Sequence, residues 1–302
     1  MSTSSGPMGV QPAIFGGIPS RGVDIPICAV FIACFLAIGA THMTIFQKNR
    51  RRGHKFVPSA LCFGFSMARV ATFTMRIVWA TRPTNQNVTI AANALVAAGV
   101  ILLWCINRVF ATRLLGEFHP RLYTKPFFEF ALRRLPYVVI ICCIPMVLVA
   151  MVLQIKTTNP HIRVITGILL KVVISFFLAF TFSPFIVLAV TLLLPGRKSE
   201  AEVARMGKGK TSTKVAVIAI ATTLLCWELG IRSATMLQTL PANAAPWYYS
   251  KAAFYVFVPA FELAVSCMFA ATRVDRLFYV KGKEEVGVER EEEKAQTMVR
   301  SV

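Results

Sequence analysis

The chain has 302 residues, of which 56% are hydrophobic, and its mean hydropathy of +0.62 excludes a water-soluble globular protein. Its formal net charge of +19 would suggest nucleic-acid binding in a soluble protein, but here the basic residues flank apolar runs instead of lining one face. The composition therefore excludes nucleic acid as a partner and predicts contact with a lipid bilayer and its anionic surface.

Residues 1–23 are rich in Ser, Gly and Pro, and Arg21 is their only charge. They lack the basic start and the short apolar core of a cleavable signal peptide. We expect a disordered extracellular or lumenal segment here, followed by a first span that acts as the membrane-targeting signal.

Seven apolar runs follow, each long enough for the roughly 20 residues that a helix needs to cross the hydrocarbon core. Pro145, Pro184 and Pro259 lie inside the fourth, fifth and seventh runs, where they predict kinked helices. The sequence predicts an all-α membrane protein, a seven-helix bundle over 24–280, with spans at about 24–46, 57–80, 88–112, 134–155, 164–194, 213–236 and 249–272.

Lys and Arg are distributed very unevenly between the two sides of such a bundle, and basic loops are retained in the cytoplasm. One side carries clusters at 48–55, 113–134 and 197–214 and the tail from Arg273, whereas the other side carries only Arg21, Arg82, Lys156 and Arg163. This asymmetry predicts an N-terminus outside and a C-terminus in the cytoplasm. It also predicts basic loops close to anionic lipids and a disordered cytoplasmic tail over 281–302.

The tripeptide Asn87-Val88-Thr89 is an N-glycosylation sequon, and the predicted topology places it on the outer side. Because it lies close to the third span, an unmodified turn asparagine is an equal alternative. Asn87 is therefore kept as a glycosylation candidate.

The sequence indicates neither a metal site nor a cofactor, and it predicts that the protein is not an enzyme. The four histidines are scattered over different segments. Residues 207–212 resemble the end of a phosphate-binding loop but lack its upstream glycine, so we interpret them as a basic flexible loop. The cysteines all fall in apolar runs, and we interpret them as small buried hydrophobes: Cys28, Cys34, Cys62, Cys105, Cys142, Cys143, Cys226 and Cys267.

Ionisable side chains within the spans cost at least a few kcal/mol each to insert, so they are normally turned inward, paired and often functional. Arg69 and Arg76 lie seven residues apart and share one face of the second span. Arg69 and Glu262 fall at similar depths and are candidate partners, and Glu228 can pair with Arg232 four residues later. The candidate ligand-binding residues are Arg69, Arg76, Lys171, Arg232, Lys251 and Glu262.

The predicted topology places four of these cations in the outer half of the bundle, namely Arg76, Lys171, Arg232 and Lys251. Since Glu228 neutralises only one of them, we interpret this half as an outward-opening cavity for an anionic group, such as a lipid phosphate or a carboxylate. Arg76 and Lys171 are its leading contacts. The alternative is a structural charge network that locks the bundle, with Lys251 and Arg232 reaching the interface.

Two known classes of seven-helix protein do not fit. Rhodopsin-like receptors place an acidic residue before the arginine that Arg108 would match, and a proline after the tryptophan that Trp227 would match; both are absent here. Microbial rhodopsins need a lysine for retinal in the seventh span, where this chain has Glu262.

A closer resemblance is carried by Phe46-Gln47-x-Asn49-Arg50-Arg51-Arg52-Gly53-His54-Lys55-Phe56, Met67-Ala68-Arg69, Arg76-Ile77-Val78-Trp79-Ala80, Trp247-Tyr248-x-Ser250-Lys251-Ala252-x-Phe254-Tyr255 and Arg273-Val274-Asp275-Arg276-x-Phe278. These strings resemble an uncharacterised family of fungal seven-span proteins, sometimes described as receptor-like. The resemblance covers about residues 25–280 and implies the fold but no activity. A more distant similarity, in the seven-span plan alone, is to the fungal lipid-translocating exporters.

Together these observations favour a receptor-like sensor of an extracellular or lipidic, anionic ligand, read by a cytoplasmic signalling partner. A lipid or amphiphile translocator and a structural membrane protein are the alternatives. We expect the plasma membrane, because no retention signal ends the chain at Val299-Arg300-Ser301-Val302, with an endomembrane as the alternative.

Overall fold

A computed structural model of the chain describes residues 13–54, 56–123, 125–130, 134–195, 207, 209–238 and 240–279. The described residues are almost entirely helical and contain no β-strand. Seven helical segments among them are long and apolar enough to cross a membrane. The predicted fold class, an all-α bundle with seven spans, is confirmed.

The first six spans are α1 (Arg21–Arg51), α2 (Val57–Thr81), α3 with α4 (Gln86–Gly99 and Ile101–Phe118), α7 (Leu135–Lys156), α8 (Pro160–Leu193) and α9 (Thr211–Leu237). The seventh is built from α10 (Lys251–Tyr255), the π-helical segment η5 (Val256–Ala260) and α11 (Phe261–Ala271). The short elements are α5 (Pro120–Tyr123), α6 (Pro126–Glu129), η3 (Ala242–Ala244), η4 (Trp247–Tyr249) and α12 (Val274–Leu277). Most of the helices run a few residues beyond the apolar runs that predicted them, because polar residues continue the helix past the hydrocarbon-like stretch.

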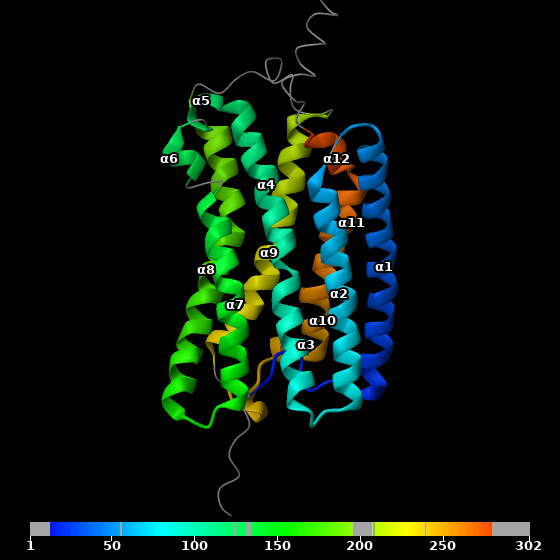
Figure 1. Ribbon diagram of the computed structural model, residues 1–302, viewed down its shortest axis with the longest axis vertical. Helices are drawn as coiled ribbons and strands as arrows, with labels where there is room; N and C mark the ends of the chain where they lie inside the picture. The colour runs from blue at the N-terminus through cyan, green and yellow to red at the C-terminus, as the bar shows by residue number, and fades with distance from the viewer. Residues whose placement is uncertain are drawn as a thin grey trace, which may run out of the picture.

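The spans alternate in direction, so the loops gather at two ends (Figure 1). The Arg21 end, at the bottom of Figure 1, holds the start of α1, the turns 82–85 and 157–159, and the segment 238–250. The Arg51 end, at the top, holds α5, α6 and α12.

Side-chain caps start three helices at the Arg21 end. The Asn85 side chain accepts hydrogen bonds from the backbone of residues 87 and 88 at the start of α3, and Asn159 accepts one from residue 161 behind Pro160 in α8. Ser250 accepts one from residue 253 in α10. Each cap satisfies backbone donors that have no intrahelical partner, which explains why these polar turns end the spans where they do.

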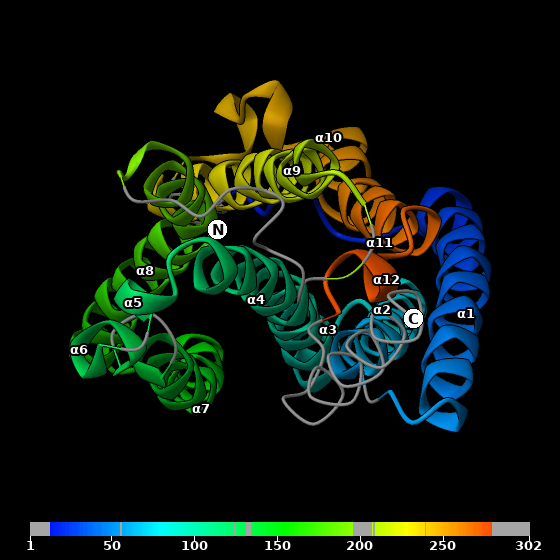
Figure 2. The same cartoon turned by 90° about the horizontal axis from the view of Figure 1, so that it is seen from above.

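The helix α4 lies in the middle of the bundle, where it contacts α2, α8 and α9 (Figure 2). Leu103, Ile106, Phe110 and Leu114 on α4 are completely buried. By contrast, large apolar side chains on α7 and α8, such as Ile141 and Ile165, are exposed on the outside. A bundle that is apolar on its outer surface suits a hydrocarbon solvent and not water.

The third span is interrupted, which the continuous apolar run 88–112 did not predict. Gly99 ends α3 and α4 begins at Ile101, with Val100 between them. A side chain at Gly99 would put its Cβ 3.1 Å from the guanidinium of Arg69, so the glycine makes room for that group. Of the three prolines expected to kink their helices, Pro259 lies inside the π-helical segment η5.

The start of the described chain differs from the disorder predicted for 1–23. The backbone N–H of Ala13 donates to Leu240 O at 2.8 Å, and that of Gly16 donates to Tyr249 O at 3.0 Å. Residues 13–20 therefore pack against the segment 238–250 at the Arg21 end. Hydrogen bonds between the two backbones hold them there, and the composition of residues 1–23 does not indicate these bonds. Residues 1–12 and the tail 281–302 lie outside the described residues.

The cysteines differ in part from the interpretation as buried hydrophobes. All eight are free thiols, and Cys28, Cys62 and Cys143 are buried, but Cys142 and Cys267 are exposed on the outer surface of the bundle. An apolar run predicts a helix in the membrane, whereas the face that a residue occupies depends on how the helices pack.

Candidate functional site

Asp24 is the centre of a buried polar network at the Arg21 end. Its side chain is completely buried in the first turn of α1. One carboxylate oxygen accepts from Arg76 Nη2 at 3.0 Å and from Tyr255 Oη at 2.7 Å; the other accepts from Lys251 Nζ at 2.6 Å and from the Ser20 backbone N–H at 2.8 Å. We call these five residues the Asp24 network. It joins α1, α2 and α10 through one carboxylate.

Arg76 is fully enclosed within this network. Its Nη2 also donates to Gly16 O at 3.0 Å, and its guanidinium lies 4.3 Å from the centre of the Phe254 ring. Its Nε donates to Tyr255 Oη at 3.0 Å, and Cys28 Sγ lies 3.3 Å from the same oxygen. The arginine predicted to lead an open anion-binding cavity is instead neutralised by Asp24 and covered by residues 13–20.

A second charged cluster lies in the middle of the bundle, and the sequence predicted both of its ion pairs. Arg69 from α2 pairs with Glu262 from α11, and Glu228 pairs with Arg232 at 3.2 Å along α9. Arg69 Nη1 and Arg232 Nη2 both donate to Val96 O, at 3.1 and 3.3 Å. The shared Val96 carbonyl and the contact between α9 and α11 bring the two ion pairs into one cluster. We call these four side chains and the shared carbonyl the Arg–Glu ring.

Two irregular helices adjoin the Arg–Glu ring. The last four carbonyls of a helix have no following turn of that helix to donate to them; Val96 is among these in α3, and its carbonyl accepts from Arg69 and Arg232. The π-helical segment η5 ends immediately before α11, which carries Glu262. Freed carbonyls within a span are tolerated only where protein groups satisfy them, and π-helical segments occur frequently at functional sites.

Two of the predicted site residues lie apart from these clusters. Lys171 is half-buried on α8, which packs mainly against α4, α7 and α9, so the structure does not bring it to Arg76 on α2. Lys171 forms no ion pair with any described residue. Asn87 is exposed in the first turn of α3 at the Arg21 end, where its backbone N–H donates to the Asn85 side chain.

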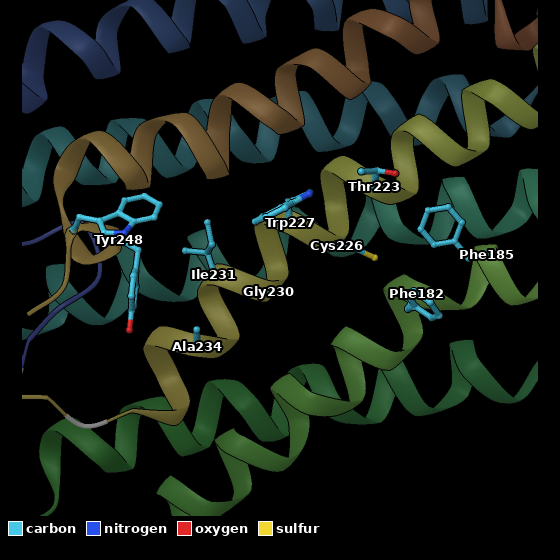
Figure 3. A pocket seen from close by; sticks show the side chains of 10 residues that line it. Phe182, Phe185, Thr223, Cys226, Trp227, Gly230, Ile231, Ala234 and Tyr248 are labelled. Carbon is cyan, nitrogen blue, oxygen red and sulfur yellow. The ribbon is translucent and has the colours of Figure 1, made fainter.

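A groove of about 380 Å³ runs between α8 and α9 (Figure 3). Exposed aromatic side chains at Phe182, Trp227 and Trp247 show that it opens on the outer surface of the bundle. None of its lining side chains is charged: Phe182, Phe185, Thr223, Cys226, Trp227, Gly230, Ile231, Ala234, Trp247 and Tyr248. We call it the α8–α9 groove. The sequence did not predict this groove, because its shape depends on how α8 and α9 pack against each other.

The groove has one polar end. Tyr248 Oη donates to the Gln238 side chain at 2.7 Å, at the Arg21 end. Gly230 lies along the groove, and a Cβ added there would meet no atom within 4 Å. The groove is therefore apolar along its length, open beside Gly230 and polar where it reaches the end of the bundle.

Asp275 holds together the Arg51 end. Its carboxylate accepts from both Arg273 Nε and Nη2 at 2.9 Å and from Asn49 Nδ2 at 2.9 Å. Burial alone would raise the pKa of Asp275, but these hydrogen bonds outweigh burial and lower its pKa below the usual value of 3.8. Arg273 adopts a left-handed backbone conformation with φ of 52°, which ends α11 and turns the chain into α12.

Asp24 is a candidate site residue that sequence reasoning missed. The available signal was an acidic residue at the very edge of the first apolar run. In the sequence, an acidic residue at this position indicates only where the span begins. In the structure, Asp24 is completely buried and pairs with Arg76 and Lys251.

Comparison with known protein families gives a match over part of the chain. Residues 198–279 match a family described as "Protein of unknown function (DUF3112)". This segment carries α9, the seventh span, the Glu228–Arg232 pair and Glu262 of the Arg–Glu ring, and most of the α8–α9 groove. No curated protein and no solved structure matches the chain. Over its last two spans, the chain is thus similar to a family of unknown function.

Proposed function

We propose that this multi-pass membrane protein is a receptor-like sensor, and not an enzyme, whose ligand is an amphiphile with an uncharged polar head. The ligand occupies the α8–α9 groove. The observation that carries the proposal is the groove itself: an open, preformed apolar channel on the outer surface of a bundle that is apolar all round, with no charged lining side chain.

The geometry of the groove favours a lipid chain with its head at the Arg21 end. Apolar and aromatic side chains line most of its length, and the hydrogen-bonded pair of Tyr248 and Gln238 lies at its end. Tyr and Trp side chains suit the level where lipid heads meet hydrocarbon. Specific binding here depends on shape, since the surrounding lipid is as apolar as the groove.

The buried cations give little support to the anionic ligand expected earlier. Arg76 and Lys251 share Asp24, Arg69 pairs with Glu262, and Arg232 pairs with its neighbour Glu228. A ligand phosphate would have to displace an internal carboxylate from its arginine or lysine partner. An uncharged head needs no such exchange.

The connection between α8 and α9 supports a sensing role. The two walls of the groove are consecutive helices, joined at the Arg51 end by the strongly basic segment 195–210. A ligand that binds one arrangement of α8 and α9 better than another shifts the population toward that arrangement. The basic loops favour an orientation in which the Arg51 end lies on the cytoplasmic side of the plasma membrane. A cytoplasmic signalling partner there detects this population shift through the segment that joins α8 and α9.

A lipid translocator is the second candidate, and the interrupted third span favours it. Many transporters place their sites at discontinuous helices near the middle of the membrane, and the Arg–Glu ring adjoins both the α3–α4 break and η5.

Photolabelling tests the proposed ligand class. The protein in lipid nanodiscs is labelled with a lipid that carries a photoactivatable acyl chain and a glycerol head, and with a matched probe that carries a phosphate head. We expect saturable labelling of peptides containing Phe182 and 223–234 by the uncharged probe. In Gly230→Leu, this labelling should fall at least several-fold, because the new side chain fills the groove.

Gly22→Leu is the matched control, since a Cβ there also meets no atom within 4 Å and lies outside the groove. Replacing a helical glycine improves helix propensity by up to about 1 kcal/mol, so Gly230→Leu should not weaken the α9 helix itself. Equal labelling of all spans, or labelling that Gly230→Leu leaves unchanged, refutes the α8–α9 groove as the binding site. Stronger labelling by the phosphate probe refutes the proposal that the ligand has an uncharged head. If the protein moves the probe between the two leaflets of proteoliposomes, the protein is a lipid translocator and the receptor proposal is refuted.

A further inference from the structure

Three atoms of the Arg–Glu ring have no hydrogen-bond partner among the described residues: Arg69 Nε, Glu228 Oε2 and Glu262 Oε2. Both glutamate side chains are completely buried. Each uses its Oε1 to accept from an arginine, so the second oxygen of each remains unsatisfied. A buried carboxylate oxygen without a donor is costly, and two in one cluster require an explanation.

The two unsatisfied oxygens belong to carboxyl groups of one buried cluster, because α9 and α11 are in contact and the arginine partners of both glutamates donate to Val96 O. Two carboxylates in a buried site cannot both stay ionised cheaply, because their like charges repel each other in a medium that screens poorly. One proton on either Oε2 removes this repulsion and donates a hydrogen bond to the other Oε2. A single proton therefore satisfies both orphaned oxygens at once.

We propose that Glu228 and Glu262 form a binding site for one exchangeable proton in the middle of the bundle. Proton uptake forms an O–H bond on one Oε2 with the proton supplied by hydronium, and release returns it to water. This site is separate from the α8–α9 groove and does not depend on the ligand proposed for it.

The surroundings of the pair fit a shared proton. The charged side chains that act on it are Arg69 from α2 and Arg232 from α9. His42 of α1 lies one turn further along α11, hydrogen-bonded to residue 266, and Asn107 of α4 is neutral and bonded to residue 222 of α9. When the pair carries a proton, the ring keeps one net positive charge, which the freed carbonyl of Val96 helps to stabilise.

The proton has a mechanical consequence. Glu228 lies on α9 and Glu262 on α11, so the shared hydrogen bond holds these two helices together. Loss of the proton sets two negative charges against each other across the same contact and pushes the helices apart. The adjoining π-helical segment η5 and the α3–α4 break are the places where the backbone can take up such a movement.

Infrared spectroscopy tests the site. Exposed carboxyl groups are ionised near neutral pH, so a protonated carboxylic acid in this protein should give an isolated C=O stretching band that shifts in D₂O. We expect this band in the wild type in nanodiscs near neutral pH. Glu228→Gln should abolish this band, because the amide N–H then donates to Glu262 in place of the shared proton and no protonated carboxylic acid remains.

Glu117→Gln is the matched control, since it makes the same change on α4 outside the ring and should leave the band in place. Absence of the band in the wild type overturns the proposal without any variant, so the test survives if Glu228→Gln fails to fold. A band that persists in both Glu228→Gln and Glu262→Gln overturns it as well, because the acid then lies elsewhere.

Discussion

Replacing Asp24 by asparagine tests whether the Asp24 network holds the Arg21 end together. Arg76 and Tyr255 donate to one oxygen of the carboxylate, and Lys251 and Ser20 donate to the other. Asparagine keeps the shape of the side chain but turns one oxygen into an NH₂ group. Whichever way the amide is oriented, at least two of these neighbours then face a donor where they had an acceptor.

The size of the effect follows from burial. The Arg76 side chain is 4% exposed and cannot turn to water, and removing one partner of a buried ion pair costs about 3–5 kcal/mol. The Lys251 side chain is 30% exposed, so water compensates for much of its loss, and its contribution is about 1 kcal/mol or less. We therefore expect Asp24→Asn to lower the free energy of unfolding by about 3–5 kcal/mol, and Lys251→Gln by about 1 kcal/mol at most.

Equilibrium unfolding in mixed micelles, followed by circular dichroism, measures both variants. The double variant Asp24→Asn with Arg76→Met removes both buried charges and should recover most of the loss, because no buried charge is then left uncompensated. If Asp24→Asn alone stays within about 1 kcal/mol of the wild type, the pair behaves like an exposed one and the reasoning is refuted.

Two further changes test the ends of the bundle. Gly16→Ala should destabilise by about 1–3 kcal/mol and speed proteolysis within 13–20, because Gly16 has a φ of +73° and a Cβ there would lie 2.7 Å from Phe254 Cγ. Asp275 should make stability fall in acid: its pKa is lowered below 3.8 by Arg273 and Asn49, so its contribution is present above that pH and is lost as the pH falls through the lower folded-state value.

Each of these has its own control. Gly22→Ala carries the same substitution at an open position of α1 and should leave proteolysis unchanged; equal protection of both variants would contradict the packing described for Gly16. Asp275→Asn should flatten the acid limb of a plot of melting temperature against pH, and an unchanged limb would show that other carboxylates control acid unfolding.

Much of the fold and one buried cluster could be predicted from the sequence. The hydrocarbon thickness sets the length of every span, so apolar runs alone located all seven. The pairs of Glu228 with Arg232 and of Arg69 with Glu262 followed from spacing and depth, since a charge within the bilayer needs a partner at its own level.

The rest depends on packing, which no run of residues displays. Asp24 stands at the edge of a span, and only the fold shows that residues 13–20 close over it. The interruption at Gly99 lies within an apolar stretch that carries no proline, and the glycine lies against the Arg69 guanidinium, a neighbour that the sequence does not display. The sequence predicts Lys171 and Arg76 at a similar depth in the membrane, but their helices α8 and α2 are not close neighbours. Depth can be predicted from the sequence, whereas the adjacency of helices cannot.

The two arginines of α2 meet their partners at very different moments of synthesis. Asp24 precedes Arg76 by 52 residues, so α1 and α2 can enter the membrane as a hairpin whose charges are already paired. Glu262 follows Arg69 by 193 residues, which at ~5–20 residues per second takes roughly 10–40 s to translate. During that interval Arg69 costs about 2.5–3.5 kcal/mol in the bilayer without its acid. The apolar side chains of the second span must therefore offset this cost until the seventh span arrives.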